Sequence, residues 1–208
     1  PAGSRKASRR AKDTKQSVVV DVTGSRLRVS GESFVQANVL LWDALVDAVV
    51  AACLGGDIGP GSRFVELHAG VGFFTLPLAA KGLVGAAVES DGFAVGDLRA
   101  NLREAGASQM IEVVAGRAET RRDLPRRLAG ADLVLVDPPR TGLEKPITEA
   151  LLEATPPRLV YLSCDPGTLA RDLGLLAAAY EVTATKAFDL FPQTPHVETL
   201  ATLERTRR

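Results

Sequence analysis

The chain has 208 residues, of which 46% are hydrophobic and 24% charged, and its 25 basic and 25 acidic side chains cancel. This composition indicates one folded domain with at most a small accessory piece, and excludes a mostly disordered chain and a collagen-like fibre. Two Cys and two His are too few for a disulfide framework, a thiolate zinc site or a His-rich metal cluster. The longest apolar run, near residues 48–54, is too short to span a membrane, and no signal peptide is recognisable, so we expect a cytoplasmic protein.

Residues 1–16 differ from the rest of the chain in charge. They hold six Lys or Arg and one Asp, a net charge of +5, and the remaining residues carry a net −5. The segment lacks periodic apolar positions, so we interpret it as a flexible basic arm. Such an arm is compatible with contact to nucleic-acid phosphates, although a solvated terminus without a partner is the commoner case.

The elements predicted along the rest of the chain alternate between strands and helices. Residues 17–35 read as a short β-hairpin around Gly24, and helical spacing of apolar residues predicts a helix over 36–53, with Trp42 and Cys53 in the core. Further strands are predicted over residues 63–68, 83–89, 110–114, 132–136, 158–163, 182–190 and 197–203, and further helices over 73–81, 91–105 and 165–178. Asp91 is the expected N-cap of its helix.

The last two predicted strands are separated by residues 191–196, too few for a parallel crossover, so we expect them to pair antiparallel. Seven strands, most of them alternating with helices, predict a three-layer α/β fold with a mostly parallel sheet that ends in this hairpin.

Two features at predicted strand ends favour a nucleotide-like ligand. Gly70 and Gly72 let the backbone approach a ligand beyond the carboxyl ends of the strands. Thr75 stands where a dinucleotide-binding motif needs a third Gly, which disfavours a dehydrogenase. Glu89 follows Gly72 by 17 residues, where a carboxylate can accept both hydroxyls of a ribose. Together they favour an adenosine-bearing cofactor, although a tightly packed turn and a surface acid remain the alternative.

Two other strand ends carry reactive or rigid groups. Asp137 precedes Pro138 and Pro139, which make a stiff loop suited to holding a flat ring against a carboxylate, or a plain strand-ending turn. Cys164 precedes a predicted helix, whose N-terminus favours a thiolate, whereas the adjacent Asp165 opposes it unless it caps the helix.

The loop at residues 191–196 is stiffened by Pro192 and Pro195. Glu198, just after it, is a candidate base if it faces the cleft, although a Glu beside a loop usually lies on the surface. His196 on its own is more often a structural hydrogen-bonding group than a catalyst.

These motifs together resemble one family, the methyltransferase domain of the S-adenosylmethionine-dependent RNA uracil-C5 methyltransferases, which make 5-methyluridine in tRNA and rRNA. The similarity runs from about residue 30 to about 203 and is most specific in the last two motifs. The segments that carry it are residues 33–38 (Ser-Phe-Val-Gln-Ala-Asn), 70–72, 88–89, 137–142, 163–173 and 189–198.

The resemblance implies a class I, Rossmann-like methyltransferase domain over residues 36–208, with S-adenosyl-L-methionine as cofactor and RNA as substrate. It implies that the Cys164 thiolate adds to uracil C6, which makes C5 nucleophilic, and that Glu198 later removes the C5 proton. No metal is needed, and the target base must leave the stack. The implied cofactor-binding residues are Gln36, His68, Gly70, Gly72, Glu89 and Asp137.

The chain departs from the family pattern near the implied cofactor site. The family usually has Asp at Glu66, an aromatic ring at His68, Cys at Ala69, Asn at Phe73 and a polar or acidic residue at Arg117. Most members also carry an oligonucleotide-binding-type domain and a central region ahead of this domain. We expect that RNA-binding domain to be absent here, with the basic arm partly substituting for it.

Two other functions remain open from the sequence. An amino-group methyltransferase would also use an Asp-Pro-Pro loop, but it has no use for Cys164 or Glu198 and usually has an aromatic residue where Arg140 stands. A non-catalytic fragment would bind cofactor or RNA without methyl transfer. The specific RNA, the target uridine and any protein partner are not indicated.

Overall fold

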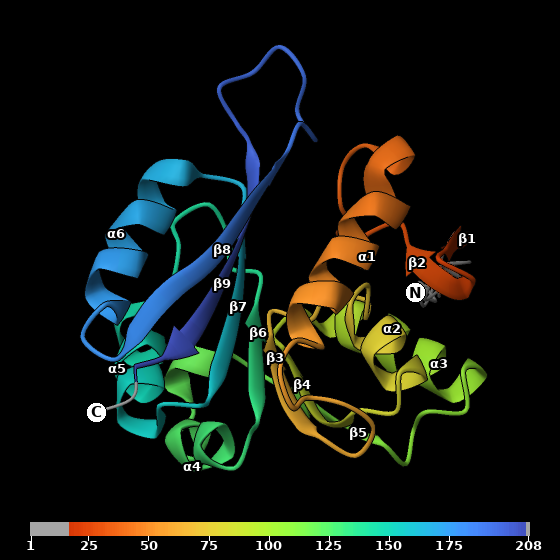
Figure 1. The fold of residues 1–208 in the computed structure, drawn as a ribbon. Helices are drawn as coiled ribbons and strands as arrows, with labels where there is room; N and C mark the ends of the chain where they lie inside the picture. The colour runs from red at the N-terminus through yellow and green to blue at the C-terminus, as the bar shows by residue number, and fades with distance from the viewer. Residues whose placement is uncertain (1–16, 207–208) are drawn as a thin grey trace, which may run out of the picture.

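A seven-stranded sheet crosses the middle of the molecule, with helices on both faces (Figure 1). The computed structural model describes residues 17–206, so the predicted basic arm at residues 1–16 lies outside the described residues. The sheet strands are β3 (Arg63–Leu67), β4 (Val84–Glu89), β5 (Ile111–Ala115), β6 (Leu133–Val136), β7 (Arg158–Ser163), β8 (Tyr180–Phe188) and β9 (Glu198–Arg205).

The order of the strands in the sheet is β5-β4-β3-β6-β7-β9-β8. Neighbours from β5 to β7 pair in parallel, and β9 pairs antiparallel with both β7 and β8. The predicted antiparallel hairpin is therefore confirmed. The order reverses at β3, which lies between β4 and β6, and this reversal opens a crevice at the carboxyl ends of the strands.

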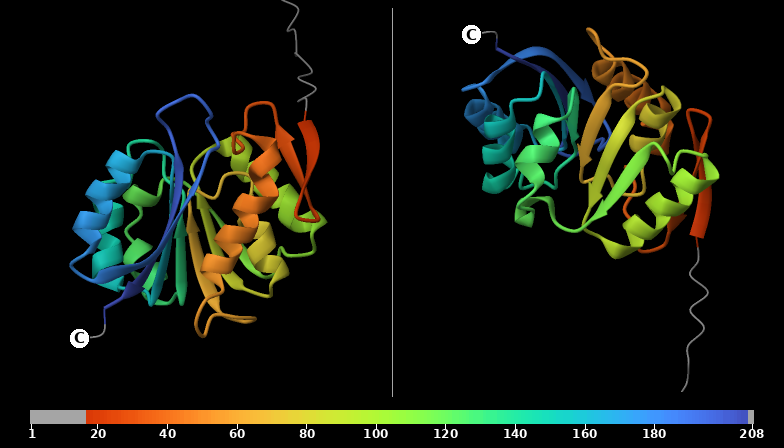
Figure 2. Two further views of the ribbon diagram at one scale, coloured as in Figure 1. Left: turned by 45° about the horizontal axis from the view of Figure 1, so that its top comes forward. Right: turned by 90° about the horizontal axis from the view of Figure 1, so that it is seen from below.

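Three helices cover each face of the sheet, which confirms the predicted three layers (Figures 1 and 2). Alternate residues of β6 enter opposite cores: Leu133 and Leu135 pack with the first group of helices, and Val134 and Val136 with the second. A strand buried on both faces reads as a continuous apolar run, as this one does. The first group is α1 (Trp42–Cys53), α2 (Thr75–Ala80) and α3 (Gly92–Glu104), and the second is α4 (Leu124–Ala129), α5 (Lys145–Ala154) and α6 (Pro166–Leu176).

The helix predicted from Gln36 begins six residues later. Asn38 has φ of 55°, a left-handed conformation, and the 3₁₀ turn η1 (Val39–Leu41) precedes α1. The Trp42 indole Nε1 donates a hydrogen bond to the Gln36 carbonyl at 2.9 Å. Gln36 therefore lies outside the helix, with its side chain free to face the sheet.

The structure confirms three other predictions about the helices and contains elements that were not predicted from the sequence. Asp91 caps α3 by accepting hydrogen bonds from the backbone N–H groups of Phe93 and Ala94, as predicted. Trp42 and Cys53 are buried, also as predicted. Helices α4 and α5 and the 3₁₀ turn η2 (Ala118–Thr120) lie in segments for which no element was predicted.

The predicted hairpin forms from β1 (Ser17–Val22) and β2 (Ser25–Ser30), and it lies against α3 (Figure 2). Two buried polar side chains of α3 bind its backbone. Asn101 Oδ1 accepts from the Arg28 N–H at 2.8 Å, and Asp97 Oδ2 accepts from the Ser30 N–H at 2.7 Å. This attachment fixes where the following segment, which contains Gln36, enters the crevice.

Within residues 17–206, none of the helices combines the length and the apolar character that a membrane crossing requires.

Candidate functional site

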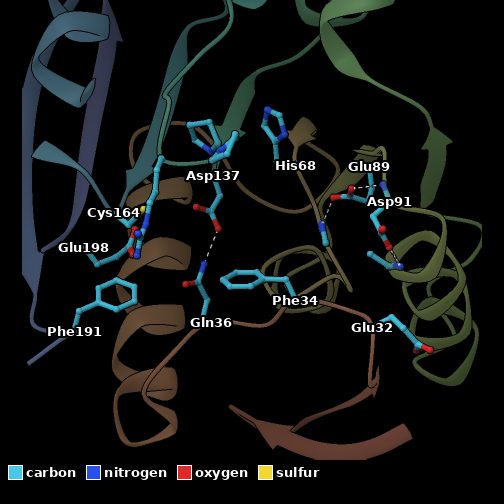
Figure 3. Close-up of a pocket in the computed structure, with 15 residues that line it drawn as sticks. Glu32, Phe34, Gln36, His68, Glu89, Asp91, Asp137, Cys164, Phe191 and Glu198 are labelled. Atoms are coloured by element: carbon cyan, nitrogen blue, oxygen red, sulfur yellow. Dashed lines mark hydrogen bonds between the residues drawn. The ribbon is translucent and has the colours of Figure 1, made fainter. Parts of the chain in front are cut away.

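A cavity of about 520 Å³ opens at the carboxyl ends of the central strands, where the strand order reverses (Figure 3). Seven of the eight residues predicted from the sequence line it, and Gly72 is the exception. The lining residues are Glu32, Phe34, Gln36, His68, Gly70, Glu89, Asp91, Ala94, Asp137, Pro138, Pro139, Arg140, Cys164, Phe191 and Glu198.

At one end of the cavity, backbone amides fix the Glu89 carboxylate. Its Oε2 accepts from the Gly70 N–H at 2.8 Å, and its Oε1 accepts from the N–H groups of Ser90 and Asp91 at 2.6 and 2.7 Å. Oε1 therefore uses both of its lone pairs on backbone N–H groups, whereas Oε2 keeps one lone pair free. The carboxylate is thus held in one orientation and keeps acceptor capacity for hydroxyl groups in the cavity.

Gly72 supports this end from behind. Its φ is +93°, and a Cβ atom there would lie 2.6 Å from Leu76 Cδ1 and 2.7 Å from Leu98 Cδ1. The absence of a side chain lets the loop pack against α2 and α3. The residue therefore shapes the loop that carries Gly70 without lining the cavity.

His68 ends β3 in a left-handed conformation, with φ of 63°. Its Nε2 atom is buried and has no hydrogen-bond partner among residues 17–206. Burial lowers the pKa of the imidazole, against the opposing charges of Glu89, Glu119 and Glu144. Burial therefore favours the neutral ring, and His68 contributes to the lining of the cavity.

The other departures from the family pattern occupy different surroundings. Phe73 packs edge-to-face on Trp42, with ring centroids 5.5 Å apart, and belongs to the core. Arg117 is largely exposed and pairs with Glu119 and with Glu144 at 3.1 Å. Neither residue lines the cavity.

Glu66 is also buried, beneath the glycine loop. The Thr75 hydroxyl donates to its Oε2 at 2.5 Å. Burial, together with the charge of Glu89, raises the pKa of Glu66 to about 8 in spite of that hydrogen bond. This carboxyl is therefore protonated in neutral solution.

Gln36 and Asp137 meet in the middle of the cavity. Gln36 Nε2 donates to Asp137 Oδ2 at 2.7 Å (Figure 3). Burial raises the pKa of Asp137 well above its usual range, and the nearby Glu198 and Glu66 add to the shift. Pro138 and Pro139, which follow this carboxyl, line the cavity with it.

Cys164 and Glu198 lie together at the other end of the cavity, at the end of β7 and the start of β9 (Figure 3). Burial and the charges of Glu198 and Asp137 raise the pKa of the Cys164 thiol, and a hydrogen bond and the positive charge from Arg140 oppose this. Asp165 caps α6 by accepting from the Thr168 N–H at 2.8 Å. Its carboxylate is therefore bound to the helix that follows the thiol.

Glu198 is almost fully buried. Its Oε1 atom has no hydrogen-bond partner in the described part of the chain. Burial raises the pKa of this carboxyl to about 7. A carboxyl in this state exchanges a proton readily near neutral pH, as a general base must.

Three lining residues belong to the recognised motifs but received no role from the sequence. Arg140 is the cation beside the thiol. Phe34 is 72% exposed, and Phe191 comes from the loop before Glu198; Figure 3 shows Gln36 between these two rings. The sequence did offer one signal for Phe34, because it is an aromatic residue within the motif at residues 33–38.

Comparison with known proteins places the chain in a family. Residues 6–206 match the family described as tRNA (uracil-5-)-methyltransferase. An uncharacterized RNA methyltransferase of Aquifex aeolicus is 36% identical over 199 residues, covering 94% of this chain and 45% of the relative. One from Gloeobacter violaceus is 39% identical over 186 residues, covering 88% of this chain and 38% of the relative.

A solved structure agrees with these matches. The Pyrococcus abyssi tRNA (uracil-54, C5)-methyltransferase, in complex with S-adenosyl-L-homocysteine, superposes with a TM-score of 0.79 at 30% identity and covers 91% of this chain and 44% of that one. The chain thus spans less than half the length of each of these relatives. It belongs to the tRNA (uracil-5-)-methyltransferase family and has the class I methyltransferase fold.

Proposed function

We propose that residues 36–208 transfer a methyl group from S-adenosyl-L-methionine to C5 of a uridine in tRNA or rRNA, through a covalent bond between Cys164 and uracil C6. The observation that carries this proposal is one cavity that holds a thiol, a buried carboxyl whose Oε1 has no partner among residues 17–206, and a second carboxylate oriented by backbone N–H groups. The family to which the chain belongs supports the same reaction.

The cavity suits the cofactor in size and in donor set. About 520 Å³ lies within the range of small-molecule sites. Glu89 would accept the ribose hydroxyls, the Gly70 loop would lie under the cofactor, and His68 and Asp137 would flank it. When bound, the cofactor would supply an electrophilic methyl group on a sulfonium, whose sulfur keeps the electron pair of the broken S–CH₃ bond and becomes a neutral thioether.

The protein's own residues account for the remaining chemistry. The Cys164 thiolate adds to C6, and the electron pair of the C5–C6 bond becomes available at C5, which takes the methyl group. The Glu198 carboxylate then removes the C5 proton, the double bond re-forms, and the thiolate leaves. A Glu198 pKa of about 7 lets this carboxyl accept that proton and return it to solvent.

The mouth of the cavity suits an unstacked base. Phe34 and Phe191 offer flat apolar faces there, and single-stranded RNA bases stack on such rings. A uridine in the cavity must be flipped out of its stack. An amino-group methyltransferase would leave Cys164 and Glu198 without a purpose, so the uracil reaction uses more of the site.

The test is methyl transfer to total RNA that lacks 5-methyluridine, with radiolabelled S-adenosylmethionine and nucleoside analysis. Wild type should place label in 5-methyluridine, and Cys164→Ala should lose at least about 10⁴-fold in turnover. Glu198→Gln should accumulate a protein–RNA adduct that survives denaturation.

Cys53→Ala is the matched control, since this thiol lies in the core. Its turnover should match wild type. Cofactor binding without label in any RNA would contradict the proposal and favour a non-catalytic role. Label in another nucleoside that Cys164→Ala leaves intact would favour an amino-group methyltransferase.

A further inference from the structure

A buried carboxylate outside the cavity connects the two loops that carry Asp137 and Cys164. Asp172 lies in α6, is fully buried and does not line the cavity. Its Oδ2 atom accepts hydrogen bonds from the Tyr161 hydroxyl at 2.7 Å and from the Leu143 N–H at 2.8 Å. Its two partners come from β7, just before Cys164, and from the loop that follows β6.

The neighbouring residue Arg171 extends the connection. Its Nε donates to Asp172 Oδ1 at 2.8 Å, and its Nη2 donates to the Thr141 carbonyl at 2.8 Å. In this loop, the Thr141 carbonyl accepts a hydrogen bond from Arg171, and the Leu143 N–H donates one to Asp172. Gly142 lies between these two contacts, with φ of +76°, and a Cβ atom there would collide with both Asp172 and Arg171.

This loop is closed tightly on itself as well. The Gly142 N–H donates to the Pro139 carbonyl at 2.8 Å, across Arg140 and Thr141. Arg140 therefore sits in a turn with stiff prolines on one side and the Asp172 contacts on the other. Its position relative to Cys164 depends on both.

The position of Arg140 matters because it lines the same cavity as Cys164, where its guanidinium hydrogen-bonds to the thiol and opposes the rise in the pKa of that thiol. The negative charges of Glu198 and Asp137, which line the same cavity, raise the pKa of the thiol. A displacement of about 1 Å changes a charge interaction at this range and can cost about 10²-fold in rate. A fixed loop therefore has a chemical use beyond stability.

On the basis of the proposed function, we infer that Asp172, Tyr161 and Arg171 form a positioning network that holds Arg140 against Cys164 and so sets the reactivity of the thiol. None of the three lines the cavity. They act through Arg140 and are positioning residues. The buried Asp172 carboxylate is compatible with the fold because it accepts hydrogen bonds from Tyr161 and Leu143 and pairs with the Arg171 guanidinium at 2.7 Å.

The test is the rate of Cys164 alkylation by iodoacetamide between pH 6 and 10, measured by peptide mass spectrometry. The free protein needs neither cofactor nor RNA for this assay. Asp172→Asn should slow alkylation at pH 7.5 by about tenfold, which corresponds to a displacement of the profile by one pH unit. Tyr161→Phe, which removes one donor, should show a smaller change in the same direction.

The variants of the buried residues Asp172 and Tyr161 could fail to fold, so Arg171→Ala tests the same network at a side chain that is 51% exposed. It should also slow alkylation. In the methylation assay, all three variants should lower kcat and leave KM for the cofactor within about twofold, because Glu89 and Gly70 are untouched.

Asp97→Asn is the matched control. Asp97 is also a buried carboxylate, with hydrogen bonds from Ser30 and Ser33. Its replacement should lower the free energy of unfolding and leave the alkylation profile of Cys164 unchanged.

Two results would overturn the inference: an unchanged alkylation profile in folded Asp172→Asn and Arg171→Ala, or faster alkylation in both. Either would make the network a purely structural one. A wild type that alkylates normally but methylates no RNA would instead overturn the proposed function and leave the network standing.

Discussion

Glu89 and Glu198 line the same cavity, the first at the end of β4 and the second at the start of β9, but their surroundings are opposite. The two oxygens of Glu89 accept three hydrogen bonds from backbone N–H groups. Glu198 has one buried oxygen without a partner among residues 17–206, and burial raises its pKa to about 7. Backbone amides orient the first carboxyl, whereas the second is desolvated.

The difference indicates a division of work along the cavity. A carboxylate bound by fixed amides presents its remaining lone pairs in set directions, which suits recognition of hydroxyl groups. A carboxyl kept from water has a pKa near neutrality, which suits proton transfer. In the proposed reaction, the Glu89 end of the cavity would bind the cofactor and the Cys164 end would exchange protons.

Of the two carboxyls, Glu198 should give the larger effect when it is replaced, in Glu198→Gln. The amide cannot accept the C5 proton, so resolution of the adduct should slow by about 10²–10⁴-fold. In wild type, the rate of resolution should rise about tenfold per pH unit below pH 7 and level off above it, because the deprotonated Glu198 is the active form. Single-turnover measurements of adduct decay against pH test both statements.

Glu204→Gln is the control for this experiment, since Glu204 lies in the same strand and pairs with Arg158, away from the cavity. Its adduct should decay as in wild type. A wild-type resolution rate that does not vary between pH 5.5 and 8 would remove Glu198 from the role of base.

A smaller effect should come from Glu89→Gln. One carboxylate oxygen becomes an NH₂ group that must face a backbone N–H, either that of Gly70 or those of Ser90 and Asp91. The side chain must turn to avoid this clash, and the cofactor loses a charged, oriented acceptor for its hydroxyl groups; such a hydrogen bond is worth about 1.5–3 kcal/mol, so the cofactor Kd should rise about 10- to 100-fold. Calorimetry with S-adenosylhomocysteine measures this directly.

The reactivity of Cys164 should not change in Glu89→Gln, because Glu89 does not appear among the charges that act on the thiol. Glu112→Gln, which alters an exposed ion pair with Arg127, should leave Kd within about twofold. An unchanged Kd in Glu89→Gln would contradict the division between the two ends of the cavity.

The sequence predicted the positions of the strand ends, and with them most of the site. Glu89, Asp137 and Cys164 each lie where an apolar run of the sequence, predicted to be a strand, ends. In a parallel sheet the carboxyl ends of the strands lie at one edge, so these residues come together there. The same reasoning separated the two thiols: Cys53 falls on the apolar face of a helix and is buried, and Cys164 faces the cavity.

What the sequence did not predict depends on contacts between distant segments. Gln36 leaves the predicted helix because Asn38 turns left-handed, and no local pattern marks that turn. Helix α5 has no side-chain cap at Glu144, so its start lacked the usual signal. The contact between Asp172 and Leu143 joins residues 29 positions apart and can be seen only in the fold.

Glu66 adds a third carboxyl to the comparison of Glu89 with Glu198. It lies beneath the glycine loop, at the Glu89 end of the cavity, yet burial raises its pKa to about 8. Its pKa in the unfolded chain is near 4.5. The folded state therefore holds this proton more tightly, and the stability that it contributes is complete below pH 4.5 and is lost as the pH rises through 8. Burial, rather than position along the cavity, decides which carboxyls behave in this way.

Glu66→Gln should flatten that decline, since the amide stays neutral and fills the same space. Between pH 5 and 8, wild type should lose on the order of 1–3 kcal/mol more free energy of unfolding than the variant does, by urea titration. The variant keeps Glu198 and Asp137, so the difference between the two slopes reports Glu66 together with its charge interaction with Asp137. Parallel slopes would mean that Glu66 is already ionised beneath the loop, and its short contact with Thr75 would then be a bond from the hydroxyl to a carboxylate.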